Sequence, residues 1–252
     1  MYKSTEIAKF MREHIKSHFP ELDVVYKSRF YLQMNACVVR GLIIGVGKGG
    51  YIKVLPVMYV VGADLSEDEL SPGLCTELYD RQTIWQFPED TPLNEVLAIE
   101  IKKRVNNSPA INFLGVFTQG VIERDIQWFA KRPEHWAANL DLAFFNMTRG
   151  APTARKDLAR AFELFRRNSR MVTDKPLRDW EEALLARFQE LESRLDRPDC
   201  ISLCRADSEK HARLLKLPPI VWPPEWPEAV PPWSKEPDSL IAKLGGFLTR
   251  KP

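Results

Sequence analysis

The C-terminal part of the chain carries a proline and tryptophan pattern that excludes most regular secondary structure. The run from 217 to 237, LPPIVWPPEWPEAVPPWSKEP, holds eight prolines and three tryptophans. Each proline fixes its own φ and pushes the preceding residue toward extended geometry, so the run predicts a stiff strap. Its tryptophans expose a large apolar area unless they dock on the parent domain, on a second copy or on another protein. The partner-binding residues expected from this pattern are Trp222, Trp226 and Trp233.

The composition is that of an ordinary soluble globular protein. The 252 residues are 44% apolar and 28% charged, which suits one large domain or two small ones with a buried core. A net charge of +2 argues against a protein dedicated to coating nucleic acid. No apolar run approaches the roughly 20 residues needed to cross a bilayer, and the N-terminus has charges where a signal peptide needs an apolar core. With Cys37 and Cys75 isolated among apolar neighbours, we expect a cytoplasmic protein without membrane contact.

Hydrophobic spacing near the N-terminus predicts one helix followed by an antiparallel meander. Apolar residues fall at helical spacing after Ser4 or Thr5, either of which can cap the helix, and the pattern ends near Phe19. The period then changes to two, which is typical of strands with one buried face. A proline within the third strand, Pro56, predicts an edge position or a bulge. The expected strands are 30–38, 42–46 and 51–61.

Helix signals dominate the rest of the chain before the strap. Thr91 and Pro92 predict a capped helix that ends near Asn106, and 111–118 predicts a buried strand or a core loop. Two amphipathic helices beyond position 150 predict an antiparallel helical hairpin. We therefore expect an α+β fold, with a three- to four-stranded antiparallel meander covered by helices. The expected divisions are an α+β domain at 1–150, a helical hairpin region packed on it at 151–217, and the strap at 218–252.

The glycine-rich stretch at 45–50, GVGKGG, has the composition of a phosphate-binding loop but not its spacing. A P-loop needs four residues between its first glycine and Gly-Lys, then a serine or threonine that opens a helix. Here Lys48 is followed by two glycines and a strand pattern. Because glycines supply the positive φ values of a tight hairpin, the stretch predicts a hairpin turn.

The segment around Glu100 and Lys102 resembles the Glu-x-Lys end of the restriction-endonuclease-like nuclease motif. The resemblance implies a divalent metal held by Glu100 and by an upstream acid, Asp80 or Asp90, with Lys102 steadying the scissile phosphate. That motif requires a strand, whereas the start at Thr91 and the apolar spacing predict an amphipathic helix. On a helix Glu100 and Lys102 point about 200° apart, which does not build a shared site.

Two groups of soft ligands have incomplete metal-binding patterns. Cys200, Cys204 and His211 supply three of the four ligands of a closed zinc site, and no second pair lies nearby in the sequence. His14 and His18 lie four residues apart but lack the intervening glutamate of a zinc protease motif. We therefore expect no metal and no cofactor.

The first helix of the expected hairpin is strongly basic. Positions 149–170 hold seven basic residues against two acidic ones, an excess of +5. A basic helix can follow a phosphate backbone, but the acidic residues at 179–192 can also pair with it across the hairpin. We expect pairing within the protein or with a partner protein, because aromatic side chains are not interleaved on the basic face. The residues of this face are Arg155, Lys156, Arg160, Arg166, Arg167 and Arg170.

The sequence assembles no convergent set of nucleophile, base and oxyanion donor. We therefore expect a non-catalytic interaction protein, such as an adaptor, an inhibitor or an immunity-type protein of a bacterial cell. It would act through the helical hairpin and the strap on another protein or on a second copy of itself. Two alternatives stay open: a metal-dependent nuclease of the Glu-x-Lys type, and a nucleic-acid-binding subunit that uses the basic helix.

Overall fold

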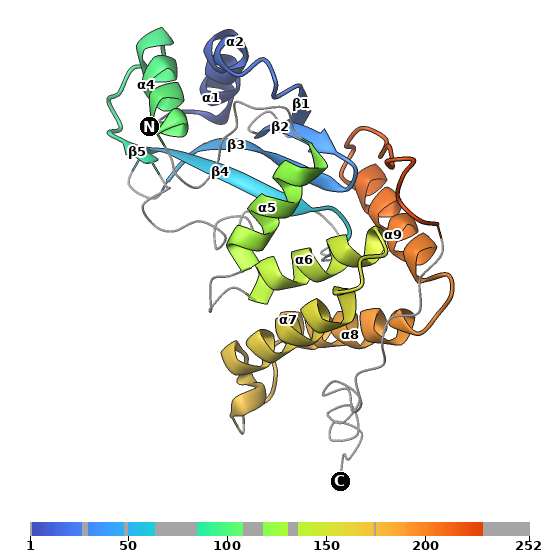
Figure 1. Cartoon of the computed structure of the whole chain (residues 1–252). Helices are drawn as coiled ribbons and strands as arrows, with labels where there is room; N and C mark the ends of the chain where they lie inside the picture. Colours follow the sequence, from blue (N-terminus) through green and yellow to red (C-terminus); the bar gives the residue numbers. More distant parts are fainter. Residues whose placement is uncertain are drawn as a thin grey trace.

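A five-stranded antiparallel meander forms the sheet of the protein (Figure 1). The computed structural model describes residues 2–26, 30–47, 50–63, 85–107, 118–130, 136–173 and 175–228. Each strand pairs with its neighbours along the chain, so the spatial order is the sequence order. The strands are β1 (Val24–Tyr26), β2 (Phe30–Asn35), β3 (Val38–Val46), β4 (Ile52–Val60) and β5 (Trp85–Phe87). The expected α+β class is confirmed, and the two short edge strands add to the strands expected.

The turn between β2 and β3 corrects the predicted strand at 30–38. The chain turns at Ala36 and Cys37, and Asn35 pairs directly with Val38. Ala36 has a φ of +46°, a conformation that glycine or asparagine usually supplies. The apolar alternation continues through the turn without a glycine or proline, which is why the sequence pattern does not reveal it.

The predicted hairpin at 45–50 is confirmed between β3 and β4. The N–H of Gly47 donates to the carbonyl of Tyr51 at 2.9 Å, and Gly50 has a φ of +84°. Strand β5 pairs with β4 only over Ile52–Val54. The expectation that Pro56 places this strand, β4, at an edge or a bulge is therefore wrong, because β4 lies between β3 and β5 and Pro56 pairs in register with Leu42. Pro56 is tolerated because it lies beyond the residues that pair with β5.

The N-terminal helix is continuous but contains a π-helical turn. It consists of α1 (Ser4–Phe10), η1 (Met11–Ile15) and α2 (Lys16–His18). The expected cap at Ser4 or Thr5 is wrong by one residue, because Lys3 is the N-cap and its N–H donates to the Glu6 carboxylate at 2.6 Å.

Helix α4 (Glu95–Asn106) confirms the helical interpretation of this segment. Its N-cap is Asn94, whose side chain accepts hydrogen bonds from the N–H groups of Val96 and Leu97. The expected cap, Thr91, therefore lies outside the helix, and the correction follows from the strong preference for asparagine at this position.

The remaining described helices include a central one, α6. They are α5 (Gln119–Ala130), α6 (Trp136–Thr148), α7 (Ala154–Asn168), the 3-10 turn η3 (Arg170–Val172), α8 (Asp179–Leu195) and α9 (Cys200–Leu214). Helix α6 contacts α5, α7, α9 and β4, and its residues from Ala143 to Thr148 are all buried. Helices α7 and α8 form the expected hairpin, in which the rings of Phe162 and Phe165 each lie 5.4 Å from that of Phe188.

The sheet separates two clusters of buried apolar side chains. On one face, Leu42 and Val54 join the main core, which extends through the N-terminal helix and α4 to α8. On the other face, Tyr59 packs with Leu215 and Leu217, just before the strap. The strap therefore begins at the sheet. Among the described residues no helix is both long and apolar enough to span a bilayer.

Candidate functional site

Trp226 anchors the strap in the body of the protein. Its side chain is only 6% exposed and packs edge-on against Phe145 of α6, with 5.6 Å between ring centroids. The indole N–H donates to Oε1 of Gln119 on α5 at 2.9 Å, which satisfies the polar atom of a buried tryptophan. The strap thus docks on its own domain in this region, while Trp233 lies outside the described residues.

A second tryptophan and an arginine of α9 complete the anchor. The N–H of the half-buried Trp222 donates to Glu209 at 2.8 Å. The Arg205 guanidinium lies 5.2 Å from the centroid of the Trp222 ring. Its Nε donates to the carbonyl of Thr148 at 3.0 Å, and its Nη2 donates to that of Pro227 at 3.0 Å. Arg205 therefore ties the strap backbone to the C-terminal end of α6.

Polar contacts continue from this anchor to the base of the hairpin. Gln119 donates to Glu123 at 2.9 Å, and Glu123 accepts from Arg149 at 2.6 Å. Arg149 also donates to Asn146, which in turn donates to Asp157 of α7 at 2.7 Å. The anchor is thus connected to α5, α6 and α7, so the strap is positioned by a rigid group of helices.

A groove of about 420 Å³ lies between the strap and the β2–β3 hairpin. Its strap wall is stiff, because prolines restrict its backbone and both of its ends are fixed in the protein. Val221 in this wall is 79% exposed. Asp23 is the one ionisable side chain among the described residues that line the groove. The lining residues are Asp23, Met34, Asn35, Ala36, Pro218, Pro219, Val221, Trp222, Pro223 and Pro224.

The sequence reveals one wall of this groove and not the other. The proline and tryptophan pattern points to the strap, but Met34 and Ala36 come from a hairpin whose turn has no sequence signal. Arg205 is also missed, because an arginine on an amphipathic helix usually faces solvent. Its position beside two indoles becomes visible only once the strap is docked.

The tip of the helical hairpin carries a second exposed aromatic group. Trp180, at the start of α8, is 46% exposed and stacks on Trp136 with 6.4 Å between centroids. Val172 of η3 is exposed nearby in the chain, and the Arg178 guanidinium lies 5.9 Å from the Trp180 ring centroid. Figure 1 places this tip at the end of the molecule away from the sheet.

The basic face of α7 is largely engaged in ion pairs. Arg166 and Arg167 both pair with Glu163 of the same helix, at 3.1 and 2.9 Å. Arg155 pairs with Asp196 at the end of α8 at 2.6 Å. The backbone N–H of Arg170 donates to Glu181 of α8, while Lys156 and Arg160 are exposed. Only part of the expected pairing therefore crosses the hairpin.

The described residues of the Glu-x-Lys resemblance do not lie together in one site. Glu100 and Lys102 lie on helix α4, and Glu100 pairs with Arg104 of the same helix at 2.9 Å. Asp90 is exposed in the turn after β5, and Asp80 lies outside the described residues. The strand that the nuclease motif requires is a helix here.

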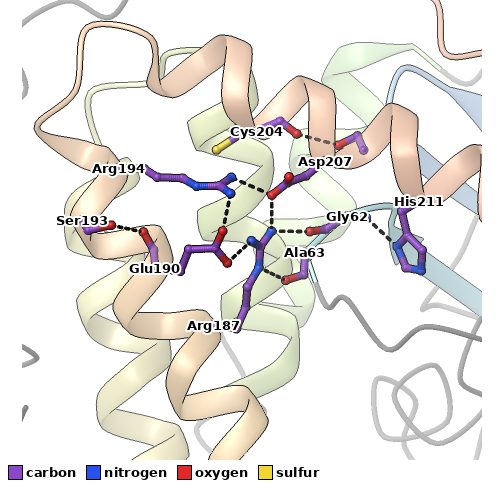
Figure 2. Close-up of polar contacts among 10 residues, drawn as sticks. Gly62, Ala63, Arg187, Glu190, Ser193, Arg194, Cys204, Asp207 and His211 are labelled. Atoms are coloured by element: carbon purple, nitrogen blue, oxygen red, sulfur yellow. Dashed lines mark hydrogen bonds and ion pairs between the residues drawn. The ribbon is translucent and has the colours of Figure 1, made fainter.

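Charged side chains around the buried Arg187 join α8, α9 and the end of β4 (Figure 2). Arg187 is 5% exposed; it donates to the carbonyl of Gly62 at 2.7 Å and pairs with Asp207 of α9 at 2.9 Å. Arg194 also pairs with Asp207, at 2.6 Å, and both arginines pair with Glu190. Each of these four charges has a partner, so the cluster holds the helices together.

The cysteine and histidine group of α9 does not build a zinc site. The hydrogen bond between the two thiols raises the pKa of Cys200 and lowers that of Cys204, so Cys200 and Cys204 are partners of each other within α9. His211 instead accepts the N–H of Gly62 at its Nδ1, at 3.2 Å. Within the described ranges, no group of three or more His, Cys, Asp or Glu side chains has an arrangement that could hold a metal ion.

Comparison with protein-family models, curated proteins and solved structures finds no match to this chain. The strap groove and the hairpin tip are the candidate sites that its geometry defines.

Proposed function

We propose that this chain is a non-catalytic interaction protein that binds an extended segment of a protein partner in the strap groove. The observation that carries the proposal is the stiff wall of the groove, which Trp226 and Arg205 hold against the helices while Val221 stays exposed. A wall ordered before binding loses little conformational entropy when a partner docks.

The lining of the groove defines the chemistry of the bound segment. Prolines, Met34 and Val221 offer apolar contacts, and Asp23 offers a single negative charge. An extended segment with apolar residues and one lysine or arginine complements this lining, because alternate side chains of an extended chain point to the same side. The exposed Trp180 of the hairpin tip is a second contact point for a large partner.

Selection from a phage-displayed library of random peptides tests the proposal. Enriched peptides are expected to carry apolar residues and a basic residue, and to bind the purified protein with a measurable change in fluorescence anisotropy. Val221→Asp and Met34→Asp should each weaken this binding by about tenfold or more, since each puts an unpaired charge into an apolar contact.

Val96→Asp is the matched control, because Val96 is an exposed valine on α4 that does not line the groove. Trp180→Ala separates the two surfaces, since peptides seated in the groove should bind this variant normally. Selected peptides that bind Val221→Asp as tightly as the wild type would refute the groove as the binding site.

A further inference from the structure

A second hollow, of about 400 Å³, lies between the N-terminal helix and α4. It is separate from the strap groove, with which it shares no lining residue. Of the described residues that line it, the polar ones are two lysines, one histidine and two asparagines, and the apolar one is Ile99, which is 53% exposed. The lining residues are His18, Ile99, Lys102, Lys103, Asn106 and Asn107.

Among the described residues, the lining of this hollow contains no carboxylate. The two acidic residues of α4 have other partners: Glu95 accepts from His14 at 3.0 Å and from His18 at 2.6 Å, and Glu100 pairs with Arg104. Hydrogen bonds from the two histidines hold the pKa of Glu95 below its usual value, so these contacts are made with an ionised carboxylate at neutral pH.

The described residues that line the hollow therefore do not neutralise its positive charge. Lys102 makes no ion pair with any described residue, and Lys103 has Glu100 only as a longer-range neighbour. The C-terminus of α4 opposes an anion with about half an elementary charge, whereas the two ammonium groups supply two full charges. The net positive charge at the hollow therefore favours the binding of an anion.

The geometry points to a binding site for a small phosphate monoester in this hollow. The phosphate, which carries up to two negative charges at neutral pH, meets Lys102 and Lys103 and accepts from the amides of Asn106 and Asn107. The organic part of the ligand covers the exposed side chain of Ile99. A volume of about 400 Å³ lies within the range of small-molecule sites and exceeds what inorganic phosphate alone fills. This inference does not rest on the proposed function of the strap.

Titration calorimetry with inorganic phosphate and with phenyl phosphate, at constant ionic strength set with chloride, tests the site. Phenyl phosphate is expected to bind more tightly than inorganic phosphate. The variant carrying both Lys102→Gln and Lys103→Gln should weaken binding of both probes by about tenfold or more, because two charge-assisted contacts are lost. Ile99→Ser should weaken binding of phenyl phosphate by several-fold and leave inorganic phosphate unchanged.

Lys210→Gln, on the exposed face of α9, is the control for loss of one surface charge and should change neither affinity. Circular dichroism confirms that each variant is folded, which is expected because Lys103 is exposed and Lys102 is only half-buried. No binding of phenyl phosphate up to about 10 mM would overturn the inference. Equal weakening by Lys210→Gln would overturn it as well, since binding would then follow overall charge.

Discussion

At the scale of single residues, Gly62 determines how closely the end of β4 approaches α9. It has a φ of +96°, and a Cβ at this position would lie 2.9 Å from the backbone N and Cα of Ser208. Its N–H donates to His211 and its carbonyl accepts from Arg187, so this residue makes polar contacts with both α9 and α8. A side chain at this position would push the end of β4 away from α9 and weaken the hydrogen bonds that Gly62 makes with His211 and Arg187.

Gly62→Ala should therefore lower the free energy of unfolding by about 3 kcal/mol, since it combines a strained φ with a clash against backbone atoms. Gly45→Ala is the control: a Cβ there meets no atom within 4 Å, and its φ is not in the left-handed region. That variant should be neutral or stabilising by up to about 0.5 kcal/mol. Denaturant unfolding monitored by circular dichroism measures both, and equal effects would show that close approach at Gly62 is unimportant.

At the scale of elements, the α7–α8 hairpin is held mainly by aromatic packing and only locally by charge. The rings of Phe162, Phe165 and Phe188 form its centre. Arg155 and Asp196 make an ion pair between the helices, whereas Arg167 pairs within its own helix. Opposite net charges on neighbouring helices thus need not produce contacts between them, because a long side chain reaches a partner one turn away at least as easily.

A double-mutant cycle with Arg155→Gln and Asp196→Asn should give a coupling free energy of about 0.5–1 kcal/mol, as expected for a partly exposed pair. The same cycle with Arg167→Gln and Glu182→Gln should give a coupling near zero. Thermal unfolding at low ionic strength provides both values. If the second pair coupled as strongly as the first, charge would organise the hairpin along its whole length.

At the scale of the whole molecule, rules based on the periodic spacing of apolar residues in the sequence predict the helices and strands whose buried side chains are large and apolar. They identify β4, α4 and the hairpin helices, and they identify the strap. They miss α9, because its buried positions are filled by small or polar residues such as Cys204, Ser208 and His211. Small side chains allow α9 to approach Gly62 closely. They do not form the hydrophobic stripe by which a helix is recognised in a sequence.

The candidate sites show the same limit. Trp222 and Trp226 are visible in the sequence because prolines flank them, and the structure finds both against the protein body. The groove also needs Met34 and Ala36, and the α2–α4 hollow needs His18 beside Lys102. Residues that meet only through tertiary packing leave no local pattern, so these combinations follow from the fold alone.

The strap anchor has a consequence for the order of folding. The hydrogen bond between Trp226 and Gln119 joins residues 107 positions apart, and its surroundings exist only after α5, α6 and α9 have assembled. Contacts of this separation form late, so the anchor should contribute little to the folding transition state. Trp226→Ala should then leave the refolding rate nearly unchanged and accelerate unfolding by about two orders of magnitude, for a loss of about 3 kcal/mol. Stopped-flow fluorescence separates the two rates, and slowed refolding would contradict late docking. On this basis the docking of the strap at Trp226 sets the lifetime of the folded protein.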